Sequence, residues 1–408
     1  MESSTFRTTL LQAAVVACSL AACRAAPHAP NSSTAANSVH TRGAVERVVA
    51  LGSMRQAELQ KLAAEFPGDI NVANDAELFR IEYWTELKGH ATLASGLLSL
   101  PSNAASSRGV VMYMHGTNFS RELSPSSPNR ADGNQETAVF AGNGYTVLLP
   151  DYIGLGVSTE AQAYVVAKPQ VDASVDLLRA AQVVVQERKW PWSPKLFLMG
   201  FSQGGQSVAA LHRELERAPM AGVTLKGSVA IAGPYDLSLV LRTKLSPSEA
   251  MKPINIGYIG FAALAYATYY ERALADVFAD QYAKSLPTLF SGKLPIETVF
   301  AGLPDDARKY FTPALANAIA TKQPTWLDAA LDENQTYQWV PKAPMQLYFG
   351  TADEDVPAAA TQAFYDYASS HGGHVTTHNV GPVDHMATSA AAYAPTLRWF
   401  DTLGNADN

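Results

Sequence analysis

The chain reads Gly200-Phe201-Ser202-Gln203-Gly204 between an apolar run, residues 196–199, and a stretch of helical patterning that begins at Gly205. A serine at a sharp turn from strand to helix is pushed out of the sheet, and glycines flank it because side chains would collide there. The pattern therefore predicts Ser202 as a nucleophile. Ordinary turns of small residues can imitate it, so an acid and then a histidine must follow, each on a loop after its own strand.

The acid is predicted after a short apolar run, residues 345–350, which reads as a buried strand entered from a proline-bounded loop. A carboxylate there would stand at the carboxyl edge of the sheet, where open α/β sheets bind ligands. Asp353 and Asp355 compete for the role. Asp355 is closer to the helix expected from Pro357 and suits a helix cap. Asp353 keeps the spacing G-x-x-D-x-x-V-P, which is typical of the acid that follows a nucleophile in this order, so we assign the acid to Asp353.

The base is predicted to be His385, which follows a predicted strand, residues 375–380, and precedes a helical pattern through residues 387–403. Only one helix and one strand fit between Asp353 and His385, which is the single βαβ step that this order of residues requires. The chain has nine histidines. Those in the leader, a hairpin, a helix, a turn or a strand are set aside by position: His28, His40, His90, His212, His371, His374 and His378.

The chemistry expected of these residues is nucleophilic attack by Ser202. His385 would take the proton from Oγ and later protonate the leaving group. Asp353 would hold the imidazole in the required tautomer and stabilise the imidazolium. The oxyanion needs two backbone N–H donors, which we predict at Gln203, directly after the nucleophile, and at Thr117, in the loop after the strand at residues 109–114.

A set of residues around this centre is predicted to bind substrate: His115, Gly116, Tyr152, Tyr258 and Phe261. The first two open the oxyanion loop, where a glycine lets the backbone approach the reacting carbonyl. Tyr152 lies in the glycine-bearing loop of the next strand, in which Asp151 is interpreted as structural because it precedes the nucleophile. The last two belong to an aromatic helical segment.

The remaining pattern predicts an α/β fold. Short apolar runs alternate with amphipathic helices, which indicates a mainly parallel sheet covered on both faces, and a hairpin around Lys88-Gly89 precedes this alternation. Residues 46–233 and 344–408 are assigned to this core. Residues 234–343 far exceed what one crossover needs, so they are predicted to form a helical cap between strands 6 and 7 that overhangs Ser202 as the wall or lid of an acyl pocket.

Composition sets further limits. The 408 residues, 47% of them hydrophobic, can bury a large core. The 30 Lys and Arg against 37 Asp and Glu give a net charge of −7, so the composition lacks the excess of basic residues that is typical of nucleic-acid binding.

The N-terminus reads as a targeting segment. Residues 1–22 are predicted to be a signal peptide, because Arg7 precedes an apolar stretch too short for an ordinary spanning helix. The run Leu20-Ala21-Ala22-Cys23 resembles a bacterial lipobox, in which Cys23 becomes the lipidated first residue; cleavage near Ala25 or Ala26 is the alternative. Residues 23–45 are predicted to be a flexible tether. Both cysteines, Cys18 and Cys23, lie within or at the end of the signal peptide, so no internal disulfide is expected.

Taken together, the motifs resemble bacterial and fungal secretory lipases of the α/β-hydrolase superfamily, including bacterial lipase/esterases associated with plant cell-wall degradation. The resemblance spans roughly residues 110–390 and rests on the following matching segments: residues 115–117, 150–156, 200–204 and 339–344, with the Asp353 and His385 loops. It implies an α/β-hydrolase fold, hydrolysis of small-molecule, lipid or sugar esters, and no metal or organic cofactor. Membrane contact would come only through a lipid on Cys23, and the protein would be an exported lipoprotein or secreted.

Other functions fit the same residues. A peptidase or amidase could use the same triad, because fold and nucleophile do not fix the leaving group. A tethered, non-catalytic ligand-binding protein on a hydrolase scaffold is the alternative from a different class. Acyl-chain length and oligomeric state are not determined by the sequence.

Overall fold

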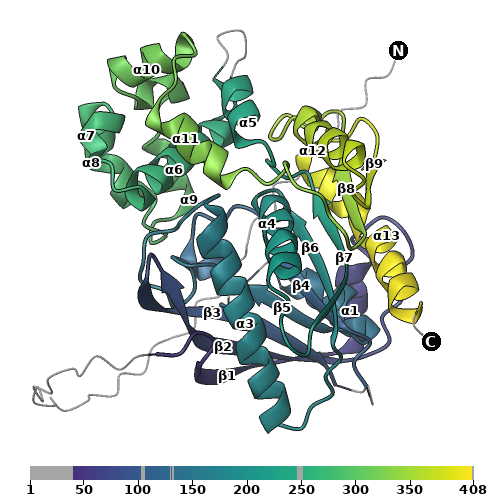
Figure 1. Cartoon of the computed structure of the whole chain (residues 1–408). Helices are drawn as coiled ribbons and strands as arrows, with labels where there is room; N and C mark the ends of the chain where they lie inside the picture. Colours follow the sequence, from purple (N-terminus) through teal and green to yellow (C-terminus); the bar gives the residue numbers. More distant parts are fainter. Residues whose placement is uncertain (1–39, 103–105, 129, 131–132, 246–250, 407–408) are drawn as a thin grey trace, which may run out of the picture. The chain divides into compact units, whose positions relative to one another are not determined.

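The computed structural model describes residues 40–102, 106–128, 130, 133–245 and 251–406 (Figure 1). The predicted signal peptide and the lipidation site at Cys23 lie outside the described residues, as does most of the predicted tether. Its last residues differ from the prediction. Arg42 pairs with Asp172 and Asp176, at 2.9 and 2.8 Å, and the Gly43 N–H donates to the Trp84 carbonyl. Residues 40–45 are therefore fixed to the core by partners that composition alone does not reveal.

In the described residues, nine strands form one sheet in the order β1-β2-β3-β5-β4-β6-β7-β8-β9. Neighbours from β1 to β5 are antiparallel in this order, and those from β5 to β9 are parallel. The strands are β1 Val45–Met54, β2 Ala76–Leu87, β3 His90–Pro101, β4 Val110–Met114, β5 Thr146–Pro150, β6 Lys195–Phe201, β7 Thr224–Ile231, β8 Met345–Phe349 and β9 Val375–Asn379.

Each central parallel strand is a continuous apolar run because both of its faces are covered. Every residue of β4 and β5 is buried. The hairpin between β2 and β3 turns at Lys88 and Gly89, whose φ angles of 52° and 82° fit the tight turn that antiparallel strands prefer. The predicted α/β fold with a mainly parallel sheet is confirmed.

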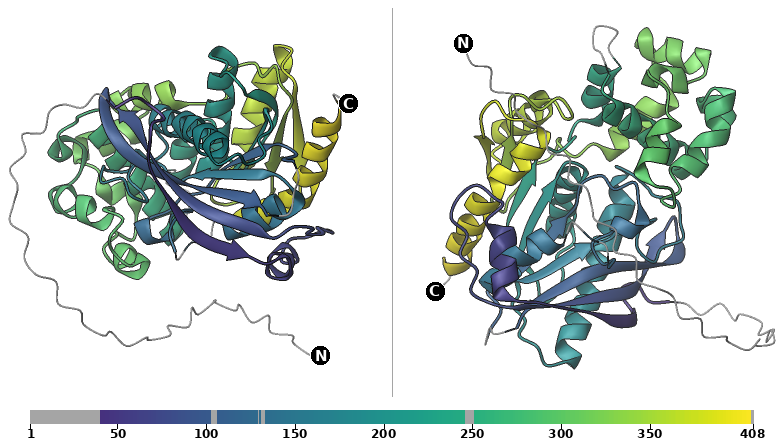
Figure 2. Two further views of the ribbon diagram at one scale, coloured as in Figure 1. Left: turned by 90° about the horizontal axis from the view of Figure 1, so that it is seen from below. Right: turned by 180° about the vertical axis from the view of Figure 1, so that it is seen from behind.

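Helices cover the two faces of the sheet (Figure 2). One hydrophobic cluster joins the sheet to α3 Ala167–Glu187, α4 Gln203–Arg217 and α12 Ala358–Ser370. A second cluster joins the opposite face to α1 Gln56–Ala63, α2 Asn134–Val139 and α13 His385–Asn405. Two one-turn 3₁₀ helices, η1 Arg121–Leu123 and η2 Ala141–Asn143, lie in the loops between β4 and β5.

A helical segment, residues 234–343, lies between β7 and β8, which are the sixth and seventh of the strands predicted from the sequence. Its helices are α5 Leu237–Lys244, α6 Pro253–Tyr269, α7 Leu274–Val277, α8 Asp280–Leu289, α9 Ile296–Ala301, η3 Ala307–Tyr310, α10 Pro313–Ala320 and α11 Trp326–Asn334. They pack around a third hydrophobic cluster, which also includes Phe119 and residues 164–166 of the core. The central helix α6 is apolar on nearly every side because neighbours surround it.

A buried seam joins the helical segment to the core. The Tyr266 hydroxyl donates to the Val165 carbonyl at 3.1 Å, and the Asn334 side-chain oxygen accepts from the Ala167 N–H at 2.8 Å. From α4, the Gln206 amide donates to the Val165 and Asn334 carbonyls, at 3.4 and 3.1 Å. Val165 has a φ of 49°, a strained conformation for a β-branched residue. The seam therefore holds the core backbone in a shape that its own sequence does not favour.

None of the helices in the described ranges is both long enough and apolar enough to cross a bilayer.

Candidate active site

The nucleophile candidate occupies the turn between β6 and α4. Ser202 has φ 58° and ψ −120°, a strained conformation that the surrounding packing must impose. The glycines on either side allow close backbone contact. A Cβ on Gly204 would lie 1.8 Å from the Met114 carbonyl oxygen, and one on Gly200 would lie 2.4 Å from the Gly204 carbonyl oxygen. The turn is therefore tight enough to place Ser202 at the carboxyl edge of the sheet.

Asp353 and His385 are brought together by the loops after β8 and β9. Asp353 Oδ2 lies 2.7 Å from His385 Nδ1, and the two side chains are only 2% and 6% exposed. The other carboxylate oxygen, Oδ1, accepts the backbone N–H groups of Asp355 and Val356 at 2.9 Å each. Three hydrogen bonds thus fix the carboxylate, and its contact with Nδ1 assigns the ring proton to that nitrogen.

The second ring nitrogen of His385 is left as an acceptor beside the nucleophile turn. Nε2 is buried and has no hydrogen-bond partner among the described residues. The His385 ring lies 4.5 Å from the ring of Phe201, the residue before Ser202. No hydrogen bond joins Ser202 to Nε2 in the described structure, which is common without substrate because such bonds tighten in the complex. His385 is the first residue of α13, where the sequence predicted a loop just before the helix.

Two tyrosine hydroxyls form hydrogen bonds with the predicted oxyanion loop. Thr117 Oγ1 lies 2.7 Å from the Tyr164 hydroxyl, and the Tyr152 hydroxyl donates to the His115 carbonyl at 3.1 Å. Within the described chain, neither the Thr117 N–H nor the Gln203 N–H donates to another residue.

Asp151 is part of the support and does not face Ser202's cavity. Its fully buried carboxylate accepts the Ser126 N–H at 2.8 Å and the Ser95 hydroxyl at 2.5 Å. Burial raises the pKa of Asp151, although the bonds from these serines oppose the rise. These contacts agree with the structural interpretation of Asp151.

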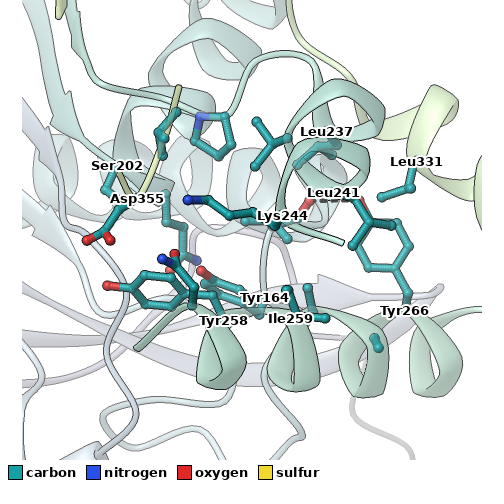
Figure 3. A pocket seen from close by; sticks show the side chains of 18 of the residues that line it. Tyr164, Ser202, Leu237, Leu241, Lys244, Tyr258, Ile259, Tyr266, Leu331 and Asp355 are labelled. Atoms are coloured by element: carbon teal, nitrogen blue, oxygen red, sulfur yellow. Dashed lines mark hydrogen bonds between the residues drawn. The ribbon is translucent and has the colours of Figure 1, made fainter. Parts of the chain in front are cut away.

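A largely apolar cavity of about 100 Å³ runs from Ser202 into the helical segment (Figure 3). Ser202 and Asp355 lie at one end of it in the view of Figure 3, and Tyr266 and Leu331 lie at the other. Aliphatic residues of α5, α6 and α11 line its length, including Leu237, Leu241, Ile259, Ala262, Leu327 and Leu331. The cavity therefore offers a mainly apolar surface that begins at Ser202.

Of the residues predicted to bind substrate, Tyr258 lines this cavity, whereas His115, Gly116, Tyr152 and Phe261 do not. His115 is fully buried, and its ring nitrogens lie 2.7 and 3.3 Å from the carbonyl oxygens of Gly116 and Asp151. Phe261 stacks on Tyr164, with ring centroids 4.6 Å apart. In the structure these residues contact protein neighbours and are not part of the cavity wall.

The structure adds cavity residues that the sequence did not single out. Asp355 was interpreted as a helix cap, but the N-cap of α12 is Pro357 and has no side-chain bond, while Asp355 lines the cavity. Tyr164 and Lys244 also line it. Only the position of Asp355, two residues after the predicted acid, could have indicated its place; nothing local marks the other two.

Comparison with known proteins bears on the family of the chain. A model of the secretory lipase family matches residues 137–405. No curated protein sequence matches the chain.

Solved structures resemble the chain over most of its length. A Legionella pneumophila protein provisionally named a hydrolase is 25% identical, with a TM-score of 0.83 over 89% of this chain and 99% of that one. The rice cell wall degrading esterase LipA from Xanthomonas oryzae is 25% identical, with a TM-score of 0.77 over 90% and 98%. Candida antarctica lipase A in its closed state is 14% identical, with a TM-score of 0.68 over 90% and 83%, a likeness of fold alone.

Proposed function

The chain belongs to the secretory lipase family and is a hydrolase of the lipase/esterase type. We propose that it cleaves carboxylic esters through an acyl-enzyme on Ser202. The observation that carries the proposal is the 2.7 Å bond between Asp353 and His385, which leaves Nε2 unpartnered beside the strained Ser202 turn. A histidine with one nitrogen held by a carboxylate and the other free is the base that a serine nucleophile needs.

The proposed reaction has two halves. Ser202 Oγ attacks the ester carbonyl while Nε2 of His385 takes its proton, and the oxyanion accepts the N–H groups of Gln203 and Thr117. The carbon–oxygen bond to the alcohol then breaks, and His385 returns the proton to the departing alcohol. A water molecule, deprotonated by His385, attacks the acyl-enzyme and releases the acid with Ser202 restored. The Asp353 carboxylate stabilises the imidazolium in both halves.

We further propose that residues 46–233 and 344–408 act as the catalytic core and residues 234–343 as its cap. The apolar cavity between Ser202 and helices α5, α6 and α11 would hold the acyl chain. Its small volume favours short acyl chains. A series of p-nitrophenyl esters of increasing chain length tests this arrangement, and a kcat/KM that keeps rising beyond eight carbons would contradict it.

Membership in a family of secretory enzymes supports export. We propose that residues 1–22 direct it and that Cys23 carries the lipid anchor, with cleavage near Ala25 or Ala26 as the alternative. Cells grown with labelled palmitate distinguish the two: label that enters the wild type and not a Cys23→Ser variant supports the anchor. Unlabelled wild-type protein would favour ordinary cleavage.

The nucleophile is tested with a fluorophosphonate probe, which labels an activated serine. We expect labelling at Ser202, and a Ser202→Ala variant that keeps its fold but loses at least about 10³ in rate. A folded wild-type protein that stays unlabelled would contradict the proposal and leave the non-catalytic binding protein. Parallel assays of p-nitrophenyl esters and matching p-nitroanilides address the amidase alternative, because faster cleavage of the anilides would favour it.

A further inference from the structure

The Ser202 end of the cavity carries a carboxylate without a bonding partner. Asp355 lines the cavity there, and among the described residues no side chain or backbone group bonds to its carboxylate. The nearby cations are engaged elsewhere: Lys244 donates to the Glu354 carbonyl, and Lys252 pairs with the Glu354 carboxylate. Asp355 therefore presents acceptor oxygens to whatever enters the cavity.

A matching donor faces the same end of the cavity. Tyr258 reaches it from α6, and its hydroxyl has no hydrogen bond to any described residue. Burial, followed by the neighbouring Tyr164 hydroxyl and the charges of Asp355 and Asp353, raises the pKa of Tyr258, so the phenol keeps its proton. Figure 3 shows the Tyr258 hydroxyl and the Asp355 carboxylate on the side of the cavity where Ser202 lies.

An unsubstituted alkyl chain would leave both groups without partners. Covering a polar group without giving it a hydrogen bond costs binding free energy, and the cost is larger for a charged group. A hydroxyl on the substrate removes this cost, because it can donate to a carboxylate and accept from a phenol at the same time. The cavity thus combines a mainly apolar wall with one polar binding position, formed by Tyr258 and Asp355, near the nucleophile.

We propose that Tyr258 and Asp355 bind a hydroxyl group on the acyl chain, within a few carbons of the ester carbonyl, so that the enzyme prefers esters of short hydroxy acids. The inference rests on the proposed ester hydrolysis. The hydroxyl belongs to the acyl part because the acyl chain, once attached to Ser202, is the part that must occupy the cavity. A cationic substituent is disfavoured because Lys244 lines the same cavity, and an anionic one is repelled by Asp355.

The test compares kcat/KM for ethyl 3-hydroxybutyrate and for ethyl butyrate in the same enzyme. We expect a wild-type ratio of about ten or more, from one charge-assisted hydrogen bond of about 1.5–3 kcal/mol. Tyr258→Phe and Asp355→Leu should each lower this ratio about tenfold. The control is Tyr269→Phe, on the same helix but outside the cavity, which should keep the wild-type ratio. The ratio is insensitive to a partly misfolded sample, because both esters use the same active sites.

A ratio near one in the wild type, or a ratio that neither variant changes, overturns the inference. A second pair, 2-hydroxyethyl butyrate and ethyl butyrate, places the hydroxyl on the alcohol instead. If the variants lower that ratio and leave the acyl ratio unchanged, the acyl assignment is wrong. A wild-type enzyme that hydrolyses ethyl butyrate without any response of these ratios refutes this inference alone. A wild-type enzyme that hydrolyses none of the esters refutes the proposed function itself.

Discussion

Replacement of Asp353 by asparagine gives the sharpest test of the proposed catalytic centre. Oδ1 of Asp353 accepts two backbone N–H groups, from Asp355 and Val356, at 2.9 Å each. An asparagine must keep its carbonyl oxygen in that position, because its amide NH₂ cannot accept a hydrogen bond. The NH₂ then takes the place of Oδ2, which lies 2.7 Å from Nδ1 of His385.

The consequence is a change of tautomer. An NH₂ that donates to Nδ1 forces the ring proton of His385 onto Nε2, which can then no longer accept the proton of Ser202. In serine hydrolases with this defect turnover falls about 10⁴-fold while the fold persists. We expect a similar fall in kcat/KM for Asp353→Asn on p-nitrophenyl butyrate, and an equal fall in the rate of fluorophosphonate labelling, with an unchanged circular dichroism spectrum.

The matched control is Asp384→Asn, one residue before His385. Asp384 caps α13 by accepting the Ala387 N–H at 2.8 Å, and asparagine caps helices equally well. This variant should therefore stay within about threefold of the wild type. If Asp353→Asn keeps more than about a tenth of wild-type kcat/KM, the bond between Asp353 and His385 does not set the tautomer that catalysis needs.

Three further changes have defined outcomes. Tyr164→Phe removes the bond to Thr117 at 2.7 Å, so kcat should fall about tenfold with KM nearly constant; an unchanged kcat would exclude support of the oxyanion loop by Tyr164. Gly204→Ala places a Cβ 1.8 Å from the Met114 carbonyl oxygen, so the free energy of unfolding in urea should fall by at least about 3 kcal/mol. In the control, Gly404→Ala, the nearest atom to the new Cβ is 3.7 Å away, and the free energy of unfolding should not fall. Burial acts to raise the pKa of Glu82, but Arg47 and Arg80 outweigh it and lower that pKa below 4.5. The two ion pairs of ionised Glu82 therefore stabilise the fold above pH 4.5, and this stabilisation is lost as the pH falls through the lowered pKa. Glu82→Gln should cost about 2 kcal/mol of unfolding free energy at pH 7 and less at pH 3, and an equal cost at both would contradict this.

The sequence predicts the pairing of Asp353 with His385 because the information it needs is local. Ser202, Asp353 and His385 each follow a short apolar run, and the carboxyl ends of parallel strands meet at one edge of the sheet. Their order along the chain then suffices to place the three loops at that edge. The choice between Asp353 and Asp355 also rested on local spacing, and the structure joins Asp353 to the histidine.

The walls of the cavity could not be predicted in the same way. Tyr164 and Asp355 become cavity residues only when the helical segment packs over the core, which is a long-range event without a local pattern. Tyr152 and Phe261 were predicted to bind substrate from their places in the glycine-bearing loop and in the helical segment, and both are buried in the structure. The edge strand β1 was missed because none of its residues is buried and it lacks a clear apolar alternation.

The buried seam between Val165 and Asn334 affects how this enzyme could exchange parts with its relatives. A chimera that received residues 234–343 from another family member would keep Gln206 and the strained Val165 but lose the matching Tyr266 and Asn334, unless the donor supplied them. The orphaned groups would be buried, where each costs about 1–3 kcal/mol. A chimera that is meant to take over the donor's substrate preference must therefore receive residues 163–167 together with the helices, because the two segments form one set of buried hydrogen bonds.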